Sequence, residues 1–353
     1  MTSTAVNRTP VSGSPAPARK QPRRVPPFWL LCAGLLILAL ASFASVALGA
    51  RPLSLETVVQ ALVSPDSANG DHAVVLSRVP RTIAALLIGA ALGLAGTALQ
   101  GMTRNPLADP GIMGLNAGAA FAVVTAIYVF GITSFTGYVW FALAGTAAAA
   151  LIVYSVASLG REGATPVKLA LAGAGLTAGL TSLLSAILVT SRQTLDTFRF
   201  WQVGTVSGRG WDVLLPLIPF LAAGAAILLA SGRLLNGLSL GDDVARGLGQ
   251  NVNRSRGIMA VGVVLLCGAA TAAAGPIAFV GLVIPHLVRG LTGPDYRWIL
   301  VLSAVLAPVL LLVSDVVGRL ILPPGEVPVG IMTAVIGAPV FIAIIRRRKL
   351  AEL

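Results

Sequence analysis

Three arginines and one aspartate stand beside or within apolar runs of this sequence. Arg78 and Arg81 lie three residues apart in RVPRT, and Asp315 lies four residues before Arg319 in SDVVGR. Guanidinium groups three apart on a helical first turn share a face and can grasp carboxylates of a partner, although such arginines also snorkel toward lipid headgroups. A carboxylate in hydrocarbon costs at least about 2.5 kcal/mol and needs a partner. We therefore expect Asp315 to pair with Arg319 or with another helix, in preference to serving a proton relay.

Other candidates for chemistry are few. His286, in IPHLVR, is expected to be a buried, hydrogen-bonded histidine in preference to a ligand. Cys32 and Cys267 lie within apolar runs and predict no disulfide. The sequence contains no GxxxxGK[ST] phosphate-binding loop, and its His, Cys and carboxylate residues lack metal-binding or catalytic spacing. We expect no metal, no cofactor bound by this chain and no enzymatic activity, so any energy source must lie on another subunit.

The segment LNGLSLGDDVARGLGQNVNR, residues 235–254, has the pattern of a short amphipathic helical hairpin. Its apolar stripe consists of Leu238, Leu240, Val244 and Leu248, and its polar face consists of Asp242, Asp243 and Arg246. Glycines punctuate both ends. Such a hairpin could lie on lipid or insert its ridge into a groove on a cytoplasmic protein. The acidic pair disfavours anionic lipid, so we favour a protein partner.

Composition indicates elements that cross a bilayer. Of the 353 residues, 56% are hydrophobic and 11% are charged, against about 25% charged in soluble domains. Since a crossing takes about 20 apolar residues, the sequence predicts about ten spanning helices. They cover residues 28–49, 82–102, 112–130, 137–159, 167–190, 211–230, 257–274, 277–290, 298–320 and 329–345.

The basic residues near the two termini predict on which side of the membrane the ends of the chain lie. Arg19, Lys20, Arg23 and Arg24 precede the first span, and Arg346, Arg347, Arg348 and Lys349 follow the last, which predicts two cytoplasmic termini. The net charge of +12 is therefore attributed to membrane orientation and not to nucleic-acid binding. We expect a disordered cytoplasmic tail over residues 1–27, a membrane domain over 28–348 and a short cytoplasmic tail over 349–353.

The sequence also repeats itself. LLIGAALGLAG, residues 86–96, aligns with LLCGAATAAAG, residues 265–275, and the same shift pairs Pro106 with Pro285 and Gly111 with Gly290. The two copies are separated by an odd number of crossings, which predicts an inverted repeat of the kind common in transporters.

Four motifs in order carry a family resemblance. They are RVPRTIAALLIGAALGLAGTALQGMTRNPLADPGIMGLNAGAA, SLGDDVARGLG, GPIAFVGLVIPHLVR and DVVGRLILPPGEVPVGIMTAVIGAPVF. Together they closely resemble the permeases of type II ABC importers for iron-siderophores and vitamin B12, the FecCD-like permeases, over about residues 28–348. The resemblance implies an all-α permease in the cytoplasmic membrane. It also implies a second copy or a paralogue, two ATPase subunits that use ATP and Mg²⁺, and an extracytoplasmic substrate-binding protein.

The resemblance implies roles for matching residues. Arg78, Arg81 and Arg319 resemble external arginines that receive acidic residues of the binding protein, and Asn105, Pro106 and Leu107 resemble part of a cytoplasmic gate. Residues resembling a coupling segment seated on the ATPase are Leu238, Ser239, Leu240, Gly241, Asp242, Asp243, Ala245, Arg246, Leu248 and Gly249. The sequence departs from the cobalamin permease at Pro166 and Val167, where that protein has small hydroxylated gate residues.

An iron-siderophore is therefore the expected cargo, with cobalamin or haem as alternatives. A more distant alternative is an ion-coupled secondary transporter, for which Asp315 is the candidate carboxylate.

Overall fold

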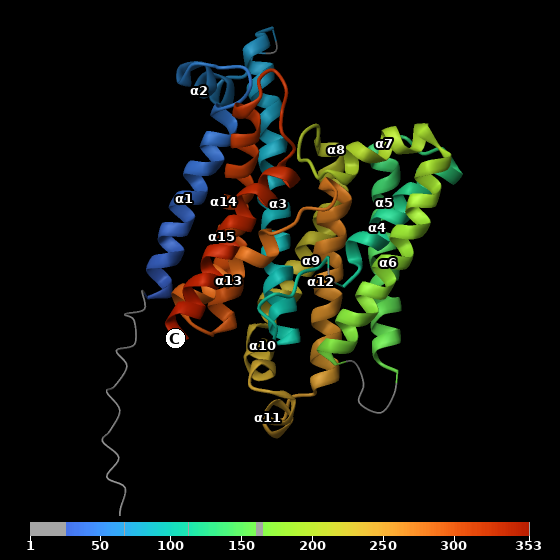
Figure 1. Ribbon diagram of the computed structural model, residues 1–353. Helices are drawn as coiled ribbons and strands as arrows, with labels where there is room; N and C mark the ends of the chain where they lie inside the picture. The colour runs from blue at the N-terminus through green and yellow to red at the C-terminus, as the bar shows by residue number, and fades with distance from the viewer. Residues whose placement is uncertain (1–25, 67, 112, 160–164, 353) are drawn as a thin grey trace, which may run out of the picture.

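The computed structural model describes residues 26–66, 68–111, 113–159 and 165–352, and the regular elements in these ranges are helices (Figure 1). The predicted tail over 1–27 lies almost wholly outside them. Seven segments are long and apolar enough to span a bilayer: α1 (Pro27–Ala47), α3 (Gly70–Thr103), α5 (Phe135–Ala157), α6 (Pro166–Thr190), α8 to α9 (Trp211–Ala230), α12 (Val252–Ala274) and α14 (Tyr296–Ile321). Shorter apolar segments are α4 (Leu115–Phe130), α13 (Val280–Thr292) and the stretch Val329–Ala343 of α15 (Val329–Glu352). These segments match the ten predicted spans and confirm an all-α membrane fold.

Short helices mark the two ends of the bundle. α2 (Leu55–Val63) and α7 (Arg192–Gln202) lie at one, the α2 end, and α10 (Gly232–Ser239) and α11 (Asp242–Gly247) lie at the other, the α11 end. The segment from Trp211 consists of α8 (Trp211–Leu214), the 3₁₀ helix η1 (Leu215–Leu217) and α9 (Ile218–Ala230). Both ends of the described chain lie toward the α11 end (Figure 1).

α7 was not predicted, because residues 191–210 lie between two of the predicted spans. Thr194, Phe198 and Trp201 are its buried residues, and their spacing of four and three is a helical pattern. The helix carries several polar residues and so escapes a search for apolar spans.

The helix α3 is longer than its predicted span. It has 34 residues, which corresponds to about 51 Å against a hydrocarbon core of about 30 Å. The Asn69 side chain accepts a hydrogen bond from the Asp71 amide and caps its start. Arg78 and Arg81 therefore lie inside α3, and their predicted place in a helical first turn is wrong. Residues 70–81 carry several polar side chains, so hydropathy alone does not include them in a span.

Close packing of small residues joins α3 to its neighbours. A Cβ atom on Gly93 would lie 2.6 Å from the Cβ of Ala307 in α14. A Cβ on Gly96 would meet the carbonyl oxygen of Gly281 in α13. Glycine thus permits backbone contacts that supply the packing energy between helices in lipid.

The predicted repeat falls on two helices that pack together, α3 and α12, and they run in opposite directions (Figure 1). The copies then diverge in structure. α3 continues past Gly96 to Thr103, whereas α12 ends at Ala274 and Gly275 adopts a φ of 77°. The antiparallel arrangement is as predicted, but the local conformation after the shared motif is not repeated.

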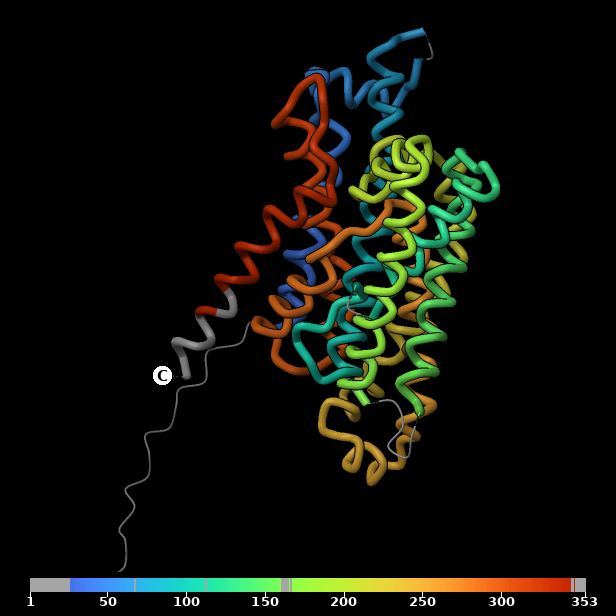
Figure 2. The backbone as a smooth tube through the Cα atoms, turned by 45° about the vertical axis from the view of Figure 1, so that its right-hand side comes forward, coloured from blue at the N-terminus to red at the C-terminus, as the bar shows by residue number. Residues whose placement is uncertain are grey.

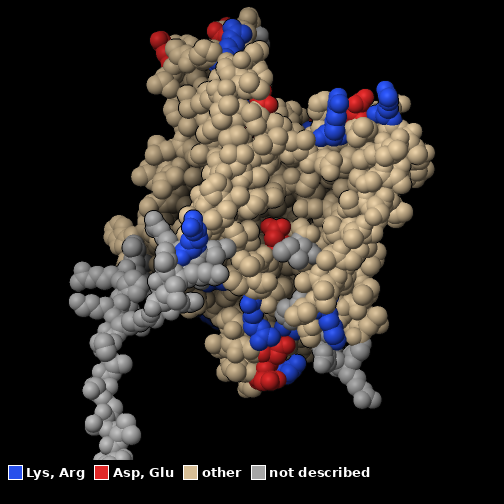
Figure 3. Space-filling view, viewed as in Figure 1, with Lys and Arg blue, Asp and Glu red and all other residues tan. Residues whose placement is uncertain are grey.

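The helix α6 has the most exposed surface of the long apolar helices. Only 11% of its most apolar window is buried, and Figure 2 shows it running along the outside of the bundle. Charged side chains on the face seen in Figure 3 gather mainly toward the two ends, and the surface between them is mostly uncharged.

Candidate docking, coupling and gate sites

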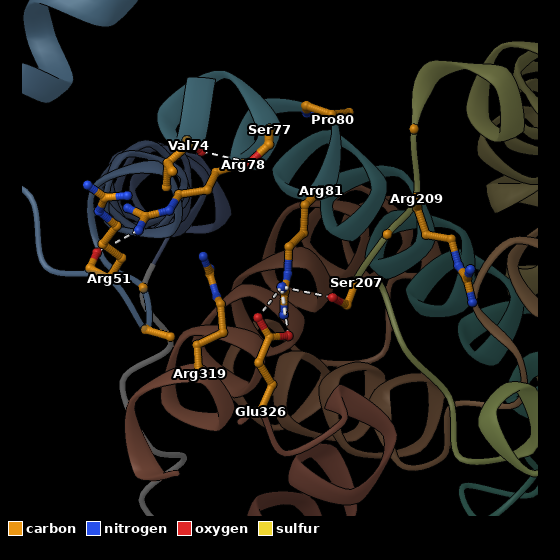
Figure 4. A pocket seen from close by; sticks show the side chains of 14 residues that line it. Arg51, Val74, Ser77, Arg78, Pro80, Arg81, Ser207, Arg209, Arg319 and Glu326 are labelled. Carbon is orange, nitrogen blue, oxygen red and sulfur yellow. Dashed lines mark hydrogen bonds and ion pairs between the residues drawn. The ribbon is translucent and has the colours of Figure 1, made fainter. Parts of the chain in front are cut away.

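A cavity of about 570 Å³ opens at the α2 end, and five of its 14 lining residues are arginines (Figure 4). Arg78, Arg81 and Arg319 all line it, so the structure brings the three predicted docking arginines together. The remaining lining residues are Gly49, Ala50, Arg51, Val74, Ser77, Pro80, Ser207, Gly208, Arg209, Gly210 and Glu326.

The guanidinium group of Arg81 is held by two carboxylates. Its Nη2 lies 2.7 Å from Oδ1 of Asp315 in α14, and its Nη1 lies 2.8 Å from Oε2 of Glu326. Nη1 also donates to the Ser207 hydroxyl at 3.2 Å. The Arg81 side chain is 12% exposed and that of Glu326 is 33% exposed. Arg81 is thus bound by one buried acid, Asp315, and by one acid that reaches solvent, Glu326.

Arg78 binds neutral oxygens instead. Its Nη1 donates to the carbonyl groups of Val46 and Ala47, at 3.0 and 2.8 Å, and its Nη2 donates to the carbonyl of Arg51 at 2.8 Å. These carbonyls lie at and just after the end of α1, so Arg78 stabilises that helix end. Arg78 and Arg81 therefore line the same cavity but bind different partners, Arg78 at the end of α1 and Arg81 at the two carboxylates.

Asp315 has the partner that the sequence predicts and a second one. Its Oδ2 lies 3.0 Å from Nη2 of Arg319, the expected pair four residues apart. Arg319 Nη1 also donates to the carbonyls of Ser45 and Leu48, each at 3.0 Å. The carboxylate, 2% exposed, bridges Arg81 and Arg319 between α3 and α14. The second pairing was missed because Arg81 lies far from Asp315 in the sequence.

Arg209 is a further arginine of this cavity, and it was not predicted from the sequence. It lies across the cavity on the loop before α8, with its side chain directed away from Arg81 (Figure 4). Its guanidinium carbon stacks 3.6 Å from the ring centroid of Phe135. Burial lowers the pKa of Arg209 to about 10, so it remains a cation at neutral pH.

At the α11 end, α10 and α11 form the predicted helical hairpin. Leu240, Val244 and Leu248 are 63%, 49% and 69% exposed and make an apolar ridge. Leu238, which was predicted to belong to the same apolar stripe, is buried. That assignment was wrong because α10 packs against α3 and α14, while Gly241, with a φ of 114°, separates it from α11.

The hairpin is fixed to the bundle by polar side chains. The Asn236 side chain donates to Asp295 and accepts from the Tyr296 amide, both at 2.8 Å, which ties α10 to the start of α14. Gln250 donates to the Leu234 carbonyl at 3.1 Å and closes the base of the hairpin. Hydrogen bonding to Arg297 lowers the pKa of Asp295 to about 2, so this anchor is ionised at neutral pH.

The acidic pair of the hairpin is divided between two environments. Asp242 Oδ1 accepts from Arg104 at 3.1 Å and from Arg256 at 3.0 Å. Asp243 is 98% exposed and pairs with Arg246 within α11. Asp242 therefore contacts the bundle and Asp243 faces outward, a distinction that the sequence pattern does not make.

The predicted gate residues lie beside a second cavity near the same end. Asn105 Oδ1 accepts from the Leu107 amide at 2.9 Å and fixes the turn that contains Pro106. Asn105 and Val167, at the start of α6, line a cavity of about 330 Å³. Its other lining residues are Thr103, Ala108, Asp109, Met113, Leu169, Ala170 and Leu171. The structure thus places the gate turn beside Val167, where the sequence departs from the cobalamin permease. Asp109, which was not predicted, lines the same cavity.

His286 is buried within α13, and its ring lies 6.0 Å from that of Phe341 in an edge-on arrangement. Within the described ranges, His, Cys, Asp and Glu form no group of three or more that could hold a metal ion. A packed core histidine fits these contacts.

Known proteins share this architecture and sequence. The FecCD transport family matches residues 36–347. The chain is 46% identical to the ferric enterobactin transport system permease protein FepD of Escherichia coli, over 89% of this chain and 94% of that protein. It is 43% identical to the iron(3+)-hydroxamate import system permease protein FhuB of Bacillus subtilis, over 91% of this chain and 83% of that protein.

A solved structure, described as an inward-facing conformation of a metal-chelate type ABC transporter, has the same fold. It superposes with a TM-score of 0.79 at 30% identity and covers 90% of this chain and 99% of that chain. The all-α bundle, the end hairpin and the extent of these matches lead to one conclusion: the chain belongs to the FecCD transport family, the multi-pass permease subunits of ABC importers.

Proposed function

We propose that this chain imports a ferric siderophore, with two ATPase subunits, an extracytoplasmic binding protein and a second permease subunit as partners. The observation that carries the proposal is the hairpin of α10 and α11. It exposes an apolar ridge beyond the bundle while its base is fastened to α14, a form suited to insertion into a groove of another protein. Such a contact would deliver the work of ATP hydrolysis to the permease.

Orientation follows from the basic residues near both termini. Because they indicate cytoplasmic ends, the α11 end would face the cytoplasm and the α2 end would face outward. The arginine cavity would then receive acidic side chains of the binding protein, and the ridge would meet the ATPase.

The exposed face of α6 supports a second permease subunit. Thr177, Thr181, Ser182 and Ser185 line a shallow cavity of about 720 Å³ together with Gly111, Ala174 and Ala178. Hydroxyl and small side chains suit close packing or a wet passage better than lipid acyl chains. Cargo would pass between the two subunits along this face.

The cargo is inferred from relatives whose names specify ferric enterobactin and iron(3+)-hydroxamate. In the proposed cycle, ATP closes the paired ATPases and moves the hairpins. The passage between the two subunits then opens toward the docked binding protein, and hydrolysis reverses the change.

Uptake in cells tests this proposal. The chain is expressed with its ATPase and binding protein in a strain unable to take up these compounds. The entry of radioactive iron is measured with each ferric siderophore and with haem, and the entry of radioactive cobalt is measured with cobalamin. We expect ATP-dependent entry of a ferric siderophore. Entry of cobalamin or haem instead would identify the alternative cargo. Uptake that is unaffected by ATP depletion and depends on a proton gradient would instead establish an ion-coupled secondary transporter.

A further inference from the structure

A single carboxylate connects the hairpin to the gate turn. Asp242 is the first residue of α11, and its Oδ1 accepts from Nη2 of Arg104 at 3.1 Å and from Nη2 of Arg256 at 3.0 Å. Arg256 belongs to α12, whereas Arg104 ends α3. One oxygen atom thus joins three separate elements.

Arg104 belongs to the gate turn as much as to α3. It is the C-cap of that helix, and the predicted gate residues Asn105, Pro106 and Leu107 follow it directly. Arg104 has a φ of 50°, which lies in the left-handed region that residues other than glycine seldom adopt. Its position therefore depends on surrounding contacts, among which the bond to Asp242 is charge-assisted.

The other anchors of the hairpin lead elsewhere. Asn236 ties α10 to the start of α14, and Gln250 closes the hairpin onto the Leu234 carbonyl. The bonds of Asn236 would carry movement of the hairpin into α14, whereas the bond of Gln250 stays within the hairpin. The bond between Asp242 and Arg104 leads from the hairpin to the residue that precedes the gate turn.

We propose that Asp242 is a positioning residue that transmits movement of the hairpin to the gate turn at residues 105–107. The inference rests on the proposed function, because the movement is supplied by the ATPase. When the carboxylate moves with α11, the bound guanidinium of Arg104 moves with it and draws on the backbone at Asn105. If the carboxylate is neutralised, two arginines with like charge face each other with no anion between them, and the gate turn separates from the hairpin.

Asp196 provides a matched control outside the hairpin. It is an exposed aspartate that pairs with Arg199, three residues later in α7, at the opposite end of the bundle. A general effect of removing a carboxylate that pairs with an arginine would appear in both Asp196→Asn and Asp242→Asn. A specific effect on the gate would appear only in Asp242→Asn.

The test uses the full complex, purified with its ATPase after Cys32 and Cys267 are replaced by serine and alanine. A spin label at Leu107→Cys, which is 45% exposed in the unsubstituted chain, reports the distance between the gate turns of the two permease subunits with and without ATP. We expect the unsubstituted complex, Asp196→Asn and the conservative Asp242→Glu to show the ATP-dependent shift. Asp242→Asn and Arg104→Gln should lose most of it while ATP hydrolysis continues.

The double variant distinguishes transmission from general damage. If Asp242 acts through Arg104, then Asp242→Asn with Arg104→Gln loses no more of the shift than either change alone. Arg104→Gln also decides the question if Asp242→Asn does not assemble. A full shift in Asp242→Asn or in Arg104→Gln would overturn the inference. Absence of any ATP response in the unsubstituted complex would overturn the proposed function, and this inference with it.

Discussion

At the scale of single residues, the three arginines of the α2 end differ in how readily they could accept a new partner. Arg78 is bound to backbone carbonyls and Arg319 to carbonyls and a buried acid, whereas Arg81 shares one bond with an acid that is 33% exposed. Glu326 therefore occupies the position that an acidic side chain of a binding protein would take. Docking of the binding protein at Arg81 would require one of its carboxylates to replace that of Glu326.

Replacing Glu326 should accordingly strengthen docking. We expect Glu326→Gln to raise the affinity for the binding protein about fivefold, equivalent to about 1 kcal/mol, because it removes a competing carboxylate from Arg81. The measurement is the dissociation constant between the binding protein and the complex in nanodiscs. Glu56→Gln, in the first turn of α2, is the control and should leave the constant unchanged. Weaker docking of Glu326→Gln would instead mean that Glu326 holds Arg81 in place for its partner.

Asp315 is expected to be structural. Asp315→Asn leaves Arg81 and Arg319 without their shared buried anion, so the free energy of unfolding should fall by about 3 to 5 kcal/mol. Thermal unfolding of the purified complex measures this loss of stability. Glu326→Gln removes the other carboxylate that binds Arg81 and should cause a smaller loss. Whatever uptake remains in Asp315→Asn should still require ATP. If a stable Asp315→Asn complex takes up cargo without the proton dependence of the unsubstituted complex, Asp315 would instead serve a proton relay.

At the scale of elements, the α10–α11 hairpin combines a buried side and an exposed ridge over a few residues. Leu238 and Ala245 are buried against the bundle, while Leu240, Val244 and Leu248 remain uncovered. An exposed apolar ridge of this kind is typical of an interaction surface. Its function can therefore be tested without disturbing the interior of the permease.

The ridge should be needed for ATPase binding. We expect Leu240→Asp combined with Val244→Asp to abolish co-purification of the ATPase, because two charges would enter an apolar groove, while the permease remains folded. Leu195→Asp on α7 is the control, since Leu195 is also exposed but lies at the opposite end. Retention of the ATPase by the double variant would assign the ridge to the lipid surface.

At the scale of the whole molecule, the long helices differ in how much of their surface the subunit itself covers. α3 is largely buried, whereas α6 leaves a hydroxyl-bearing face open along the outside of the bundle. A face of this composition needs either a protein neighbour or water. The complete passage would therefore be formed only when two subunits meet.

Crosslinking tests that arrangement. In a chain without native cysteines, Ser185→Cys on α6 should form a product between two permease subunits in membranes, because its face would lie at their interface. Leu151→Cys on α5, which is 68% exposed in the unsubstituted chain, should face lipid and should not. Non-reducing electrophoresis separates the products. Equal crosslinking at both positions would exclude α6 as the specific interface.

The sequence by itself determined the membrane-spanning helices, the amphipathic hairpin and the need of Asp315 for a partner. These features follow from local composition, because an apolar segment of sufficient length requires lipid and a charge within it requires a counter-charge. The pair of Asp315 with Arg319 was predictable for the same reason, since both lie on one helix.

Only the tertiary structure decided which distant groups meet. The bonds from Asp315 to Arg81 and from Asp242 to Arg104 join residues far apart in the chain, and no local pattern specifies them. Helix packing also decided that Leu238 is buried while Leu240 is exposed. Hydropathy records how apolar a segment is, whereas the pairing of charges and the choice of covered face depend on how complete helices fit together.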